Sequence, residues 1–152
     1  IISVTWPDNA TDDVDIWVQD PNGEVVSYLK KDAGWLHLDR DDRGDINDTV
    51  EIDGEIIVHP INQEIVTIRG FIAGEYTVNL YYFDQKSDEP IEAVVKVEKV
   101  NPTLRLVFID KVLLTEVDQE TTVTRFKLSG SGKLTGFNKL PKRLTPFNLD
   151  AG

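Results

Sequence analysis

An acidic run, HLDRDDRGDIND, occupies residues 37–48 of the chain. Six of its twelve residues are aspartate or asparagine, and carboxylate and amide oxygens are ligands that Ca²⁺ takes in proteins. The run also contains a glycine, Gly44, as calcium loops do at their sharpest turn. The carboxylates that we expect to act as ligands are Asp39, Asp41, Asp42 and Asp45.

A second pair of carboxylates, Asp13 and Asp15, lies in the stretch DVDIWVQD. Both alternate with Val14, Ile16 and Val18, and alternation with a period of two is typical of a half-buried strand. Asp13 and Asp15 therefore share one face of that strand and can both point at the same loop. If the two acidic segments meet, their charges repel one another unless a cation lies between them. The pattern predicts a Ca²⁺ site that both segments form.

The acidic run has another interpretation. It is not a helix-loop-helix calcium loop, because Arg43 and Val50 stand at the fifth and twelfth positions of that pattern. Asp and Asn are also favoured in surface turns, where their side chains bond to nearby backbone groups. With Arg40 and Arg43 neutralising part of the charge, the run can be a solvated or salt-bridged loop that binds no metal.

Catalytic patterns are poorly represented. The chain has no cysteine, which excludes disulfides, thiol catalysis and thiolate metal sites. It has two histidines, His37 and His59, and no Gly-x-Ser-x-Gly elbow, so a hydrolase triad finds no support. The stretch SGSGKLTG fails the phosphate-loop spacing, because Lys127 and Leu134 stand where glycine and Ser or Thr are required. We expect a protein that is not an enzyme.

The charge of the chain limits the classes of partner that it can bind. The formal net charge is −11, which argues against nucleic acid, because phosphate binding requires a basic surface. Residues 1–64 carry 16 acidic and 4 basic side chains, a balance of −12, whereas residues 65–152 carry 11 acidic and 12 basic ones, a balance of +1. No apolar run is long enough to span a membrane, so we expect no membrane insertion by this segment.

Strand patterns dominate the chain. The turn Asp20-Pro21-Asn22-Gly23 joins the strand around Asp13–Val18 to a strand over Glu24–Tyr28, and this hairpin is the clearest local feature. In AGEYTVNLYYF, the residues Tyr76, Val78, Leu80 and Tyr82 share one face. Short strands separated by turn residues predict an all-β, antiparallel β-sandwich of jelly-roll type. The other expected strands are Ile1–Trp6, Glu55–His59, Glu64–Ile72, Tyr76–Phe83, Ile91–Val100, Thr103–Thr115 and Thr121–Ser129.

The last part of the chain differs from the rest. We expect the sandwich to cover residues 1–129, and residues 130–152 to form a basic extended tail or an appended edge strand. Large apolar side chains recur in this tail, which a wholly solvated segment would not need. They predict contact with a protein partner, with self-association by tail exchange as the leading form, or a tail that folds back on its own domain. The residues concerned are Phe137, Leu140, Leu144 and Phe147.

Sugar binding is the rival hypothesis. Exposed tryptophans stack on sugar rings, and of Trp6, Trp17 and Trp35 the best candidate is Trp17, on the face that carries Asp13 and Asp15. The alternative is that all three indoles cover the edge of the core, as aromatic side chains commonly do.

The strings DVDIWVQDPNGEVV, LDRDD and AGEYTVNLYYF resemble those of bacterial extracytoplasmic Asp-rich domains, which are similar to the pre-peptidase C-terminal-like β-sandwich modules of secreted proteases. The likeness covers about residues 3 to 83. It implies a non-catalytic, extracytoplasmic module of a kind of which some members bind Ca²⁺. From the whole sequence we expect a structural or interaction module that is extracytoplasmic or lies on a particle surface and takes part in an assembly. Asp13, Asp15, Asp39 and Asp41 fall on matching positions. An accessory domain of a secreted enzyme is a further reading of the same resemblance.

Overall fold

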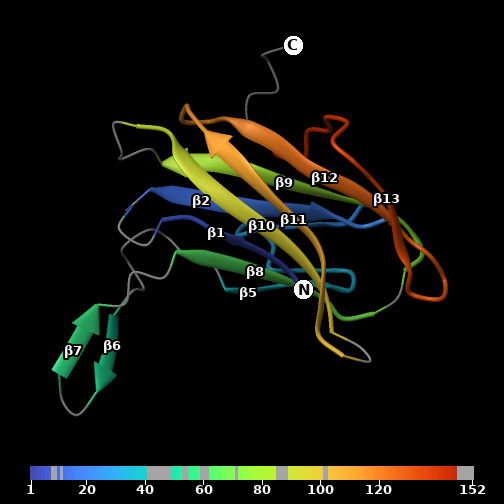
Figure 1. Cartoon of the computed structure of the whole chain (residues 1–152), viewed down its shortest axis with the longest axis horizontal. Helices are drawn as coiled ribbons and strands as arrows, with labels where there is room; N and C mark the ends of the chain where they lie inside the picture. The colour runs from blue at the N-terminus through green and yellow to red at the C-terminus, as the bar shows by residue number, and fades with distance from the viewer. Residues whose placement is uncertain are drawn as a thin grey trace.

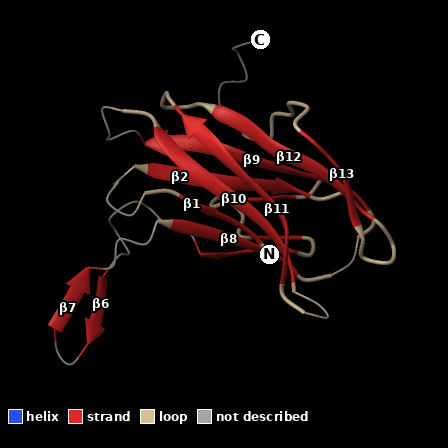
Figure 2. Cartoon of the chain, in the orientation of Figure 1, coloured by secondary structure: helices blue, strands red, loops and turns tan. Residues whose placement is uncertain are grey.

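The computed structural model describes residues 1–7, 10, 12–40, 49–52, 55–58, 62–70, 72–84, 89–100 and 103–146, with the backbone alone described at 40, 49–52 and 55–58. This part of the chain consists of strands and connecting turns, and it contains no helix (Figures 1 and 2). Accordingly, no helix in these ranges is long and apolar enough to cross a membrane. The expected all-β fold is confirmed: two antiparallel sheets pack against each other as a sandwich.

The two sheets have six and five strands in the described residues. The first, sheet A, has the order β11-β10-β1-β8-β5-β4, and the second, sheet B, has the order β13-β12-β9-β2-β3. The strands of sheet A are β1 (Ile2–Thr5), β4 (Asp32–Ala33), β5 (Leu36–Arg40), β8 (Gln63–Ile68), β10 (Ile91–Lys99) and β11 (Arg105–Leu114). The strands of sheet B are β2 (Asp13–Gln19), β3 (Val25–Val26), β9 (Gly74–Asp84), β12 (Glu120–Leu128) and β13 (Leu134–Asn138). A separate hairpin pairs β6 (Thr49–Ile52) with β7 (Glu55–Val58).

The core lies between the sheets and follows the period of two. On β9, the predicted face of Tyr76, Val78, Leu80 and Tyr82 is completely buried in the core. The core-facing residues of β2 and β12, its neighbours in sheet B, and of β10 in sheet A belong to the same core cluster. Burial of a large apolar side chain contributes about 1.5–3 kcal/mol, so these alternating positions are the main source of stability.

The expected β2–β3 hairpin is confirmed, with Val18 opposite Val26. The buried Asp20 closes its turn, because Asp20 Oδ1 accepts hydrogen bonds from the backbone N–H groups of Asn22 (2.8 Å) and Glu24 (3.0 Å). Gly23 takes a φ of 87°, a value that favours glycine. The hydrogen bonds of Asp20 and the positive φ of Gly23, which the turn residues predict, therefore set the register of the β2–β3 hairpin.

Within the described part of the C-terminal region, residues 134–138 belong to the sandwich. Leu134 pairs with Leu128, and β13 is the edge strand of sheet B. Of the two expected forms of this region, the structure has the appended edge strand, followed by residues 139–146, which we call the return segment. The return segment passes back over the outer face of sheet B, as its hydrogen bonds to Thr122 and Glu120 show.

Candidate functional site

Three carboxylates converge at one edge of the sandwich. Asp13 and Asp15 of β2 and Glu64 of β8 each offer a carboxylate oxygen, and these oxygens all lie within 4.8 Å of one another. Asp15 and Glu64 are almost completely buried, and Asp13 is half-buried. Oxygen donors of this type and number suit a hard divalent cation such as Ca²⁺.

The backbone explains why a residue of sheet A reaches sheet B. β3 pairs with β2 only at Val18 and Gln19, so the earlier part of β2 has no neighbour on that side among the described strands. Glu64 Oε1 accepts a hydrogen bond of 2.7 Å from the backbone N–H of Ile16 at this open edge. The carboxylate of Glu64 therefore joins the two sheets as well as completing the acidic cluster.

A buried phenol lies beside the cluster. The Tyr82 hydroxyl donates a hydrogen bond to Asp12 Oδ2, and both side chains are buried. Burial and the neighbouring Asp12 carboxylate together raise the pKa of Tyr82, so the phenol stays protonated. The Trp6 indole N–H donates to the backbone oxygen of Asp12 at 2.9 Å, which fixes the chain just before Asp13.

Asp39, a predicted cation ligand, does not lie in the cluster of Asp13, Asp15 and Glu64. Asp39 lies in β5, not in a loop, and alternates with the core residues Leu36 and Leu38. It therefore lies on the outer face of sheet A, where it accepts a hydrogen bond from Thr67 and approaches Arg69 Nη2 at 3.9 Å. Glu64 alternates with Thr67 and belongs to the inner face of the same sheet, so the two carboxylates lie on opposite sides of it.

His37, the first residue of the acidic run, lies between two carboxylates. The imidazole Nδ1 of His37 lies 2.5 Å from Asp32 Oδ1, and its Nε2 lies 3.5 Å from Asp39 Oδ1. The remaining predicted ligands, Asp41, Asp42 and Asp45, lie outside the described residues.

The predicted exposure of Trp17 is wrong. Trp17 does lie on the same face of β2 as Asp15, but only 3% of its surface is exposed. Its indole meets the Tyr28 ring edge-on at 6.0 Å. The return segment crosses this face at Asn79, the residue paired with Trp17 in the sheet, since Asn79 Nδ2 donates to the Lys142 oxygen at 2.6 Å. Sheet B is thus covered on both faces here, and Trp17 cannot stack on a sugar.

The tail residues contact their own chain. Phe137 is half-buried and packs on Phe108 and Phe126, so it is not a free partner-binding side chain. Leu144 is half-buried too, and its backbone N–H donates to Glu120 Oε2 at 2.7 Å. Leu140 is 63% exposed, as a partner-binding residue requires. Phe147 lies outside the described residues.

Two carboxylates of importance escaped the sequence analysis. Glu120 accepts hydrogen bonds from Asn79 Nδ2 and from three donors of the return segment: the N–H of Leu144 and the N–H and hydroxyl of Thr145. The sequence does indicate the position of Glu64. It lies two residues before the core residue Val66, so it points to the inner face of the same strand. The sequence does not indicate the role of Glu120, because its donors come from a distant part of the chain.

Strand β11, the edge of sheet A, carries exposed aliphatic side chains. Leu106, Ile109 and Leu113, with Leu104 just before the strand, are each between 50% and 66% exposed. We call these four residues the β11 patch. The expected strand over Thr103–Thr115 includes them, but the sequence does not indicate that its second face lacks a covering element.

Comparison of the chain with protein-family models, with curated proteins and with solved structures finds no match.

Proposed function

We propose that this chain is a non-enzymatic structural module that acts by binding protein, with a second copy of itself as the first partner, and that its acidic edge binds Ca²⁺. The observation that carries the proposal is the β11 patch, a row of exposed aliphatic side chains on the last strand of a sheet. Proteins rarely leave such a row open on an edge strand, because it invites association. The resemblance of residues 3 to 83 to extracytoplasmic domains supports an extracytoplasmic setting.

Side chains already occupy part of the β11 backbone edge. Asp110 Oδ1 accepts a hydrogen bond of 2.9 Å from the N–H of Lys111, and Gln119 Oε1 accepts one of 2.8 Å from the N–H of Thr115. These contacts compete with an incoming strand for the same donors, which disfavours simple strand addition. The affinity of the patch would therefore come from its apolar face.

The charges around the patch favour a second copy as the partner. Two copies with a net charge of −11 repel each other over most of their surface. The strands beneath the patch instead carry both signs: Lys111 Nζ lies 3.8 Å from Glu92 Oε1, and Lys96 and Arg105 are exposed nearby. Mixed charge allows opposite signs to meet when the same surface packs on itself.

Light scattering over a range of protein concentrations tests this proposal. The intact chain should show a dimer mass at high concentration, and changing Leu106, Ile109 and Leu113 together to Gln should return the mass to that of one chain. Leu29→Gln is the matched control, because Leu29 is 59% exposed but lies in the Ser27–Lys30 turn. A single-chain mass at every concentration, or an equal loss of the dimer with Leu29→Gln, contradicts the proposal.

The cation part of the proposal is supported by the cluster of Asp13, Asp15 and Glu64. Three carboxylates whose oxygens lie within 4.8 Å repel one another, and two of them are almost removed from water. A bound Ca²⁺ would neutralise this repulsion. Because Glu64 comes from sheet A and the aspartates come from sheet B, the ion would also connect the two sheets.

A carbohydrate module is a second candidate, now at Trp35. This indole is 55% exposed, and its ring lies over Gly70, where an added Cβ would be 2.6 Å from Trp35 Cδ2. A ring supported on one side and open on the other suits stacking on a sugar. Retardation in a polysaccharide gel that Trp35→Ala removes and Leu29→Ala retains would support it, whereas equal mobility of Trp35→Ala and the intact chain would reject it.

A further inference from the structure

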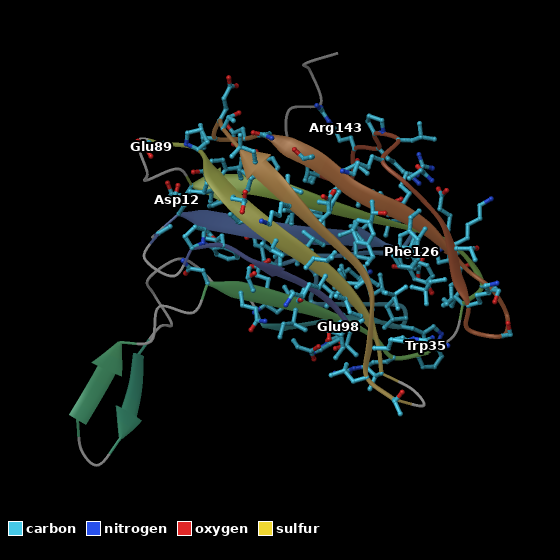
Figure 3. All side chains as sticks on the ribbon, in the orientation of Figure 1. Asp12, Trp35, Glu89, Glu98, Phe126 and Arg143 are labelled. Carbon is cyan, nitrogen blue, oxygen red and sulfur yellow. The ribbon has the colours of Figure 1, made fainter. Side chains whose placement is uncertain are left out.

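A cavity of about 320 Å³ opens between the two sheets at one end of the sandwich. Sheet A contributes Ile2, Ile68 and Val97 to its lining, and sheet B with its edge contributes Phe126, Leu128 and Leu134. Trp35 and Glu98 lie at this end of the sandwich. Asp12, which directly precedes Asp13 of the acidic cluster, lies at the opposite end (Figure 3). The volume falls at the lower limit of small-molecule pockets, which is about 300 Å³.

The lining explains what such a cavity would accept. Ile2, Val97 and Phe126 belong to the buried core, so the interior is continuous with apolar side chains. An apolar cavity of this kind does not favour water, and an aliphatic chain gains free energy in proportion to the area that it removes from solvent. The interior therefore selects an aliphatic group.

The mouth of the cavity carries cationic side chains. Arg69 and Lys99 are among the lining residues, together with Glu98. Lys99 stands opposite Arg105 in the β10–β11 pair, and two like charges directly across a sheet destabilise it. Within the described ranges neither Lys99 nor Arg105 has an ion pair, whereas Arg69 Nη2 lies 3.9 Å from Asp39 Oδ1.

Among the described residues, Lys99 is therefore a lining cation without an ion pair, in a strongly acidic chain. Lys99 lines the cavity and Arg105 stands opposite it in the sheet, so an anion beside Lys99 would relieve the repulsion between these two cations. An anionic group would form charge-assisted hydrogen bonds with these donors. A purely apolar ligand would not need a cation beside the cavity.

We propose that this cavity binds a small amphipathic anion, with the aliphatic chain between the sheets and a carboxylate-type head at Lys99. The cavity shares no lining residue with the β11 patch or the acidic cluster. A medium-chain fatty acid is the simplest ligand with this chemistry.

Calorimetry with decanoate below its micelle concentration tests the proposal, with decanol as the neutral analogue and acetate as the head alone. We expect saturable binding of one decanoate per chain, binding of decanol at least about tenfold weaker, as the loss of one charge-assisted contact implies, and no binding of acetate. Trp35 fluorescence should change with the same saturation, because its ring lies over Gly70, which lines the cavity.

Variants distinguish the residue that binds the carboxylate head of the ligand from the residues that contact its aliphatic chain. Lys99→Gln should reduce decanoate affinity to that of decanol, and Lys96→Gln is its matched control, since Lys96 is exposed on the same strand and does not line the cavity. Leu134→Trp should fill the cavity and abolish both ligands, and Ile68→Phe serves the same purpose if Leu134→Trp does not fold. Absence of saturable decanoate binding, equal affinities for decanoate and decanol, or equal effects of Lys96→Gln and Lys99→Gln would overturn the proposal.

Discussion

The ring of Phe137 lies parallel to the ring of Phe108, with 5.1 Å between the ring centroids and 1° between the planes. Phe108 belongs to the edge strand of sheet A, and Phe137 belongs to the edge strand of sheet B. The pair therefore closes one side of the sandwich, and Phe126 extends it toward the core at 5.5 Å from Phe137.

Phe137→Ala should lower the free energy of unfolding by about 1–3 kcal/mol. The expected loss is at or below the 3–5 kcal/mol typical of a fully buried Phe, because Phe137 is only half-buried. Leu140→Ala is the control, since Leu140 is exposed two residues after β13 and should cost little. Urea unfolding of both variants measures the difference, and equal losses would show that Phe137 contributes nothing specific.

Glu120→Gln should detach the return segment. The Glu120 carboxylate now accepts hydrogen bonds from four donors. In the variant, the glutamine amide replaces one of the two acceptor oxygens with an NH₂ group. Donors of Leu144 and Thr145 therefore lose an acceptor. We expect a stability loss of about 1–3 kcal/mol and much faster hydrogen exchange at Lys142, Leu144 and Thr145. The exposed Glu116 provides the matched change, Glu116→Gln, which should leave exchange in the segment unaltered.

The outcome of Glu120→Gln also bears on tail exchange between subunits. If the released segment then binds another copy, the variant should gain mass in light scattering. Fast exchange at a single-chain mass would instead mean that the segment has no second partner. The expected self-association through Leu140 and its neighbours remains a prediction, because the contacts described above lie within one chain.

Ca²⁺ should raise the melting temperature of the intact chain, and a chelator should reverse the rise. Binding to the native state alone stabilises it by about 2.7 kcal/mol when the free ion is at 100 times its Kd, which for a chain of this size corresponds to roughly 5–10 °C. Asp15→Asn or Glu64→Gln should abolish the response. Glu89→Gln, a change of the same charge at an exposed turn, should keep it. A melt that does not respond to millimolar Ca²⁺ would reject the cation site.

Stability should fall at alkaline pH because of Tyr82. Its pKa is raised in the folded chain by burial and by Asp12, whereas the unfolded phenol ionises near pH 10. Above about pH 10 the unfolded state therefore loses a proton that the folded state keeps, and stability decreases by at most about 1.4 kcal/mol per pH unit for this group. Below that pH the contribution is constant. Tyr82→Phe should flatten the profile between pH 10 and 12, and an unchanged slope in this variant would exclude Tyr82 as its source.

The sequence predicted most strands because alternation is local. Val14, Ile16 and Val18 indicate the inward face of β2 directly, and the turn at Asp20 follows from the residue types. In LHLDR, Leu36 and Leu38 alternate with His37 and Asp39 in the same way, so this stretch carries a strand pattern as well as acidic side chains.

The candidate site was predictable only in part. Asp13 and Asp15 were placed on a shared face and do cluster, but their third partner, Glu64, comes from the opposite sheet. Trp17 was expected in solvent because a strand with one apolar face usually has an open second face. Its burial depends on the return segment, and no pattern around Trp17 can reveal a segment that lies more than a hundred residues later in the chain.

The position of β1 has a consequence for synthesis of the protein. Ile2–Thr5 lies in the middle of sheet A, between β8 and β10, so this strand is synthesised long before either of its partners. Pairing over such sequence separations is slow in β-proteins, and an unpaired apolar strand is prone to aggregate meanwhile. We expect a nascent chain released before residue 91 to depend on chaperones, whereas one released after residue 99 can complete the centre of the sheet unaided.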